Sequence, residues 1–85
     1  MNSLGSNRQL AENKLILLYI IESIGMPVSN LTITKLILEN KFMNYFLLQQ
    51  HLNELCESNF LSSELIDGKT FYTITPNGKQ TLGYF

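Results

Sequence analysis

The stretch from Asn44 to Leu61, NYFLLQQHLNELCESNFL, has the pattern of one amphipathic helix with a recognisable signal at each end. Four residues recur at the helical period and predict one buried stripe: Leu48, Leu52, Leu55 and Cys56. At the start, the Asn44 side chain can accept a hydrogen bond from the first unpaired backbone N–H groups. At the end, Asn59 suits the left-handed turn that closes a helix, after which Phe60 and Leu61 fold back onto the apolar side.

The opposite face of this helix is unusual, because aromatic and amide groups gather at its N-terminal end. We expect a set of residues to project outward there: Met43, Phe46, Leu47 and Gln50, followed by Asn53, Glu54 and Glu57. A helix inserted in a DNA groove can present such a face, and so can a protein-binding surface. A third interpretation is that Phe46 or Leu47 packs against the preceding helix or the following hairpin and widens the core.

Length and composition limit the classes of protein to which this chain can belong. The 85 residues suffice for one domain with a single modest core. Apolar residues are 45% of the chain and charged residues 15%, which favours a packed globule over disorder. The net charge of −1 and the pI of about 5.7 lack the basic excess that is usual for a nucleic-acid binder. Any DNA binding must therefore depend on where the six basic residues lie.

The sequence carries no pattern of export or membrane insertion. The segment MNSLGSNRQL has no basic run followed by an apolar one, so we expect no signal peptide. The longest apolar run, Leu15 to Ile21, is far shorter than the roughly 20 residues that cross a bilayer. The single cysteine, Cys56, lies on the predicted buried stripe and cannot form an internal disulfide, which favours a reducing compartment. We expect a cytoplasmic protein with no membrane partner.

The side chains that could carry chemistry are few and do not converge. His51 and Cys56 are five residues apart, about 140° around a helix, so they cannot meet as a nucleophile–base pair. His51 alone is interpreted as a residue on the flank of its helix. One His, one Cys and seven scattered carboxylates provide no paired metal-ligand spacing. We therefore expect no enzyme activity, no metal site and no cofactor.

The N-terminal third of the chain predicts a short leader and a long helix. Residues 1–7 are small and polar, which predicts a flexible leader, and residues 8–85 form the predicted domain. A first helix should run from about Arg8 to Ile24, where Gly25 and Pro27 end it. One apolar stripe should face the core: Leu10, Leu17, Ile20, Ile21 and Ile24. A second strip lies on roughly the opposite side: Ala11, Leu15, Leu18 and Tyr19.

A helix that is apolar on two sides must be buried on both. The second strip, together with Tyr84 and Phe85, would otherwise leave a sizeable apolar patch in water. We therefore predict a homodimer through these residues, with the same surface of each subunit in the interface.

The segment between the two long helices predicts a second, shorter one. Val28 can form a short β bridge, and Ser29 or Asn30 can cap a helix that runs to about Glu39. The inward residues of this helix should be Ile33, Leu36 and Ile37. Asn40 can supply the left-handed residue that ends it. A helix, a tight connection and a second helix are the outline of a helix-turn-helix.

The pattern changes to that of strands after residue 60. Two β-prone segments, around Leu61–Ile66 and Thr70–Thr75, flank Asp67-Gly68, which is a strong hairpin signal. Thr75 can then cap a last helix near residues 76–84, with Pro76 at its first position. Three helices, a β-hairpin and a helix predict an α+β domain.

This order of elements resembles the winged-helix domains of MarR- and PadR-type bacterial regulators. The most specific part is the segment Tyr72-Thr73-Ile74-Thr75-Pro76-Asn77-Gly78 followed by Leu82, which is similar to the Y-x-L-T-x-x-G-x-x-x-L ending of those wings. The segments LAENKLILLYII and LILENKFMNYFLLQQHLNEL are also similar to an uncharacterised bacterial winged-helix family of unassigned function. The similarity covers about residues 8 to 85.

The resemblance implies a winged helix-turn-helix and a DNA-binding transcriptional regulator whose partner is duplex DNA. The candidate DNA contacts are Lys35, Asn44, Tyr45, Phe46, Gln49, Gln50 and Lys69. The groove helix of MarR-like domains often offers Ser, Thr and Arg, whereas this chain offers Phe46, Leu47 and Gln50. The wing tip of such domains often carries several basic residues, whereas this one offers Lys69. The alternative function is a winged-helix protein–protein interaction module without DNA binding.

Overall fold

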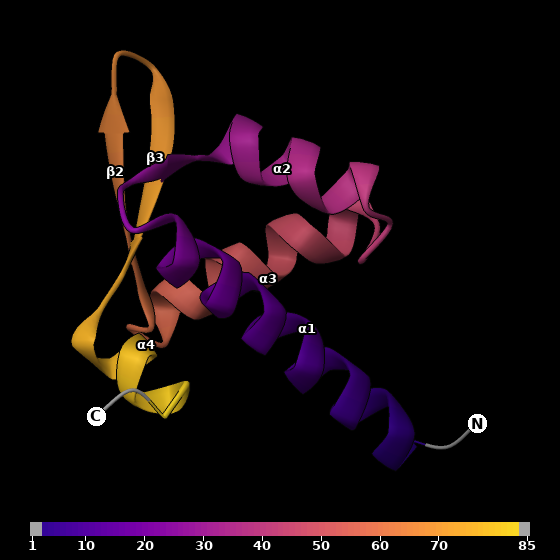
Figure 1. Cartoon of the computed structure of the whole chain (residues 1–85). Coiled ribbons are helices and arrows are strands. Elements are labelled where there is room, and N and C mark those ends of the chain that lie inside the picture. Colours follow the sequence, from indigo (N-terminus) through magenta and orange to yellow (C-terminus); the bar gives the residue numbers. More distant parts are fainter. Residues whose placement is uncertain (1–2, 84–85) are drawn as a thin grey trace.

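The computed structural model describes residues 3–83, and it describes the side chains from residue 8 onward. This part of the chain contains four helices and a small three-stranded antiparallel sheet, so the predicted α+β class is confirmed (Figure 1). The elements are α1 (Ser3–Ile24), β1 (Val28–Ser29), α2 (Asn30–Glu39), α3 (Tyr45–Glu57), β2 (Leu61–Ile66), β3 (Lys69–Ile74) and α4 (Pro76–Thr81).

Helix α1 is longer than the sequence predicted. It begins at Ser3 rather than near Arg8, so the prediction of a leader is corrected for residues 3–7, which are helical. The physical reason is that adding a residue to an existing helix costs far less free energy than nucleating a new helix. The predicted end is confirmed, because α1 stops at Ile24 and Gly25 adopts the left-handed conformation with φ of 75°. Figure 1 shows the N-terminal half of α1 projecting past the rest of the domain.

Local capping chemistry places α2 and α3 as expected. The Ser29 hydroxyl accepts a hydrogen bond from the Thr32 N–H at 3.1 Å and caps α2. The left-handed residue after α2 is Lys41, with φ of 57°, and not Asn40, whose φ is −93°. The Asn40 side-chain amide donates instead to the Leu36 carbonyl at 2.8 Å, at the end of α2.

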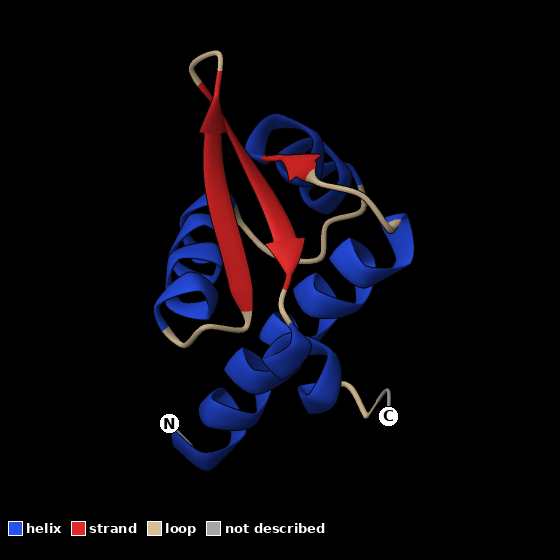
Figure 2. Ribbon diagram, turned by 90° about the vertical axis from the view of Figure 1, so that its left-hand side faces the viewer, coloured by secondary structure: helices blue, strands red, loops and turns tan. Residues whose placement is uncertain are grey.

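The β-hairpin forms at the predicted turn. Asp67 and Gly68 both have positive φ, 51° and 76°, as a two-residue hairpin turn requires. Strand β2 pairs with β3, and β1 adds on the other side of β3 through Val28 opposite Tyr72, giving the order β1–β3–β2. Both views show the hairpin turn projecting beyond the helices (Figures 1 and 2). Thr75 caps α4, and Pro76 takes its first position, as predicted.

The core lies between α1, α2, α3 and the sheet. Its buried hydrophobic residues are Leu17, Leu18, Ile21, Val28, Ile33, Ile37, Met43, Leu48, Leu52, Leu55, Leu61 and Tyr72. Three residues expected inside are more than one-third exposed: Leu10, Ile24 and Leu36. Leu10 is 38% exposed and belongs to the N-terminal half of α1.

Two residues expected outside are buried, namely Leu18 and Met43. Met43 directly precedes the cap of α3, where an apolar side chain commonly turns back onto the first turn of the helix. Leu47, also expected outside, is partly buried and packs against the core, as the third interpretation of that face allowed. Within residues 3–83, every helix is too short or too polar to cross a lipid bilayer.

Candidate nucleic-acid interface

A network of side-chain hydrogen bonds fixes α3 against α2 and the sheet. The Asn30 amide donates to the Gln49 carbonyl oxygen at 2.7 Å and to the Tyr72 hydroxyl at 3.0 Å. The Gln49 amide donates in return to the Thr34 hydroxyl at 3.0 Å and to the Asn30 carbonyl oxygen at 3.3 Å. Both amides thus have donor and acceptor partners inside the protein. Gln49 was predicted to contact DNA bases, and the structure instead places it in the scaffold that positions α3.

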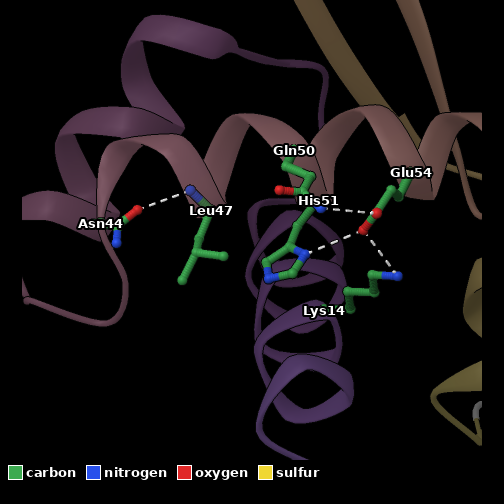
Figure 3. Close-up of polar contacts among 6 residues, drawn as sticks. All are labelled: Lys14, Asn44, Leu47, Gln50, His51 and Glu54. Atoms are coloured by element: carbon green, nitrogen blue, oxygen red, sulfur yellow. Dashed lines mark hydrogen bonds and ion pairs between the residues drawn. The ribbon is translucent and has the colours of Figure 1, made fainter. Parts of the chain in front are cut away.

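The first turns of α3 present the residues that were expected to face outward. The Asn44 side chain accepts a hydrogen bond from the Leu47 N–H at 2.8 Å, which caps the helix (Figure 3). Phe46 is 84% exposed, and its ring meets that of Tyr45 edge-on, with centroids 6.3 Å apart. Gln50 is exposed one turn after Phe46, and its amide donates to a Glu54 carboxylate oxygen at 3.2 Å. Aromatic and amide groups therefore stand together in the solvent at this end of α3.

The two predicted lysines lie apart from this group. Lys35 is on the outer side of α2, where it lines a shallow hollow of about 500 Å³. Lys69 is the first residue of β3 and lines a hollow of about 300 Å³ between the hairpin turn and the start of α2. In Figure 1 the hairpin and the start of α3 lie at opposite ends of the α2–α3 pair. The predicted DNA contacts thus form an aromatic and amide cluster at the start of α3, with Lys35 on α2 and Lys69 on β3 apart from it.

A second polar cluster joins α1 to α3, and the sequence did not predict it. His51 was expected on the flank of its helix, but it is 1% exposed. Its Nδ1 lies 3.4 Å from Glu54 Oε1, and that oxygen is also 3.0 Å from the Lys14 ammonium (Figure 3). The His51 Nε2 is buried and has no hydrogen-bond partner among the described residues. The signal was present, since position 51 completes the i, i+3, i+4, i+7 pattern of residues 48, 52 and 55.

This cluster stabilises the ionised form of the Glu54 carboxylate. Hydrogen bonds from Lys14 first, and then from Gln50 and His51, lower the pKa of Glu54 from its ordinary 4.5 to about 2. The carboxylate is therefore ionised at neutral pH, and the Lys14 ammonium beside it compensates its negative charge. For Cys56, which is half-buried, burial raises the pKa of the thiol and disfavours the reactive thiolate. In the part of the chain that the structure describes, no three His, Cys, Asp or Glu side chains are placed to hold a metal ion.

The residues predicted for a dimer interface are only partly available. Leu15 and Tyr19 are exposed, at 41% and 56%, and Ala11 is exposed beside them. Leu18 is 1% exposed and belongs to the core, which corrects its assignment to the outward strip of α1. Tyr84 and Phe85 lie outside the described residues.

No curated protein and no solved structure matches this chain. A protein-family model, described as a domain of unknown function (DUF4364), matches residues 13–85. That match begins in the middle of α1 and includes all the later elements, namely β1, α2, α3, β2, β3 and α4. It therefore contains the α2–α3 scaffold, the aromatic and amide cluster and the hairpin. The chain belongs to the DUF4364 family.

Proposed function

We propose that this chain is a winged-helix DNA-binding domain of a cytoplasmic transcriptional regulator, similar to those of the MarR and PadR type. In this proposal α2 and α3 form the helix-turn-helix and the β2–β3 hairpin is the wing. The observation that carries it is the start of α3, where Tyr45, Phe46 and Gln50 are exposed while the next amide, Gln49, is bound into the scaffold. A helix held firmly on one side and presenting base-sized groups on the other is suited to a major groove.

Each exposed group of α3 has a chemical counterpart on duplex DNA. The unpaired backbone N–H groups at the start of α3 and the positive end of its dipole favour a phosphate. The Phe46 ring can contact thymine methyl groups, and the Gln50 amide can form a paired hydrogen bond with adenine. Gln49 takes no part, because its amide is bound to Asn30 and Thr34.

The cationic contribution to binding is small in this proposal. Lys69 on the wing and Lys35 on α2 are candidates for phosphate contacts, and the chain carries a net charge of −1. We therefore expect weak affinity with a shallow salt dependence, equivalent to about 2–4 phosphates per subunit.

The test is selection of bound sequences from random duplex DNA, followed by fluorescence titration at low salt with a selected and a scrambled duplex. We expect Gln50→Ala to reduce binding of the selected duplex by about 1–3 kcal/mol and to relax sequence preference. Gln80→Ala, an exposed amide on α4, is the matched control and should change nothing. Lys69→Ala should weaken all sequences alike, whereas Lys79→Ala should not.

The second candidate function is a protein-contact module, and exposed apolar side chains favour it. Leu31 and Leu65 are 73% and 72% exposed, and neither belongs to the α3 surface that would enter a groove. Contiguous exposed apolar patches mark sites that bind another protein, and Leu31 and Leu65 are the two most exposed leucines among the described residues. The same titration separates the two functions, because a module of this kind binds neither duplex at low salt.

A further inference from the structure

A hollow in the outer side of α1 opens at the point where α4 ends. It has a volume of about 550 Å³ and is lined by four residues of α1, among them Leu15 and Tyr19, by Phe42 of the α2–α3 connection, and by Thr81 and Leu82 at the end of α4. Leu15, Tyr19 and Phe42 are each more than one-third exposed. Protein hollows of this size take up small organic groups, and an apolar lining is unfavourable while it faces water. We call this feature the α1–α4 hollow.

The backbone turns at the rim of the α1–α4 hollow. Leu82 lines the hollow, and its N–H donates to the Gly78 carbonyl at 3.2 Å as α4 closes. Gly83 follows with φ of 86°, and its N–H donates to the Gln80 carbonyl at 2.9 Å. A left-handed glycine with this hydrogen bond is the turn that ends many helices, and it folds the chain back over the last turn of the helix. The residue after Gly83 therefore starts beside the hollow.

The next two residues of the sequence are aromatic. Tyr84 and Phe85 follow Gly83 directly, and both lie outside the described residues. Three residues of extended chain span up to about 10 Å, so Phe85 can reach the hollow from its rim at Leu82. We propose that Phe85 fills the α1–α4 hollow of its own chain, while Tyr84 covers the rim and keeps its hydroxyl group in water.

The lining and the covalent connection both favour this occupant. A phenylalanine ring has no polar group that needs a partner in an apolar hollow, and Phe42 and Tyr19 offer it aromatic neighbours. Because the segment is tethered at Leu82, its effective concentration at the hollow greatly exceeds that of a second copy in dilute solution. This packing is independent of whether the domain binds DNA. A second copy of the chain would meet the filled surface.

A single tryptophan can report the environment of position 85. The sequence contains no tryptophan, so Phe85→Trp introduces one fluorescent probe. We expect its emission to be blue-shifted and protected from acrylamide quenching, and both properties to be the same at every protein concentration. Gln80→Trp, on the exposed side of α4, is the matched control and should emit as an indole in water. Unfolding in urea should make the two spectra alike.

A double-mutant cycle tests the contact without the larger ring. Phe42→Ala and Phe85→Ala should each lower the urea midpoint, and the double variant should lower it by less than the sum, because both changes remove one shared contact. Leu31→Ala with Phe85→Ala is the control pair, whose shifts should add because Leu31 lies on α2 outside the hollow.

Three outcomes overturn the proposal. The first is a Phe85→Trp emission equal to that of Gln80→Trp. The second is a blue shift that develops only as the protein concentration rises, which would mean that a second copy fills the hollow. The third is a Phe42–Phe85 cycle in which the two shifts simply add.

Discussion

Gly78 packs so closely that a single methyl group should destabilise the domain. It is buried in the first turn of α4, and its N–H donates to the Thr75 hydroxyl at 3.0 Å. A Cβ atom built on Gly78 would lie 2.6 Å from Cγ1 of Ile74 and still closer to the backbone oxygen of Phe60. That oxygen accepts the Thr75 N–H at 3.1 Å, so it cannot move away without weakening the contact that anchors α4.

Two effects of opposite sign compete in Gly78→Ala. Replacing a helical glycine with alanine normally stabilises a protein by about 0.5–1 kcal/mol. Forcing an extra methyl into a filled site costs about 1–3 kcal/mol. Because one of the clashing atoms here belongs to the backbone rather than to a flexible side chain, we expect the cost to lie in the upper half of that range. The net expectation is a loss of about 1–2 kcal/mol in the free energy of unfolding.

Urea unfolding followed by circular dichroism measures this difference. With an m-value of about 1–2 kcal/mol/M, Gly78→Ala should lower the midpoint by about 1 M without changing the slope. Gln80→Ala, on the exposed side of the same helix, should stay within about 0.5 kcal/mol of the unmodified protein. An alanine variant that is as stable as the original, or more so, would refute the packing argument, since helix propensity alone predicts that outcome.

Three further changes test the scaffold around α3. Asn44→Ala removes the cap on the Leu47 N–H and should cost about 1 kcal/mol, measurable by urea unfolding. Gln49→Ala removes two hydrogen bonds to the half-buried Asn30, which keeps its contacts to Tyr72 and Thr34, and should cost about 1 kcal/mol in the same assay; an unchanged midpoint would contradict the network. The lowered pKa of Glu54 contributes stability that is complete above its ordinary 4.5 and is lost as the pH falls towards about 2. Glu54→Gln should therefore flatten the acid side of the stability profile in that window, by about 1 kcal/mol because the carboxylate is one-third exposed and screened.

The sequence predicted the elements well because their ends are set by local chemistry. Asn44, Ser29 and Thr75 each cap a helix through their own side chain, and this needs no distant neighbour. Asp67-Gly68 likewise specifies its turn through backbone conformation alone. These signals lie within a few residues of the feature that they determine, so the sequence pattern was sufficient to place these helix starts and the hairpin turn.

Burial of individual side chains was harder to predict, because it depends on which elements pack together. Leu18 belongs to a strip that period alone assigned to the surface, yet it is part of the core. His51 has a polar side chain at a core position of its helix; its Nδ1 meets Glu54 one turn further along α3, and Lys14 of α1 pairs with the same carboxylate. Gln49 and Gln50 are adjacent and chemically identical; the helical period placed Gln50 on the outward face, but both were predicted to contact DNA. The difference is one step around the helix, which turns Gln49 towards Asn30 and Gln50 towards the solvent.

The homodimer that the sequence predicts would compensate for the weak DNA binding proposed for a single copy. A single copy offers few cations, since Lys14 is already paired with Glu54 and the net charge is −1. Two copies joined through α1 would present two α3 helices and two hairpins on one particle. Once one subunit has bound DNA, binding of the second subunit becomes intramolecular. Its high effective concentration then increases the affinity without any new basic residue. A domain with this composition could therefore bind a two-fold symmetric operator firmly while each half binds only weakly.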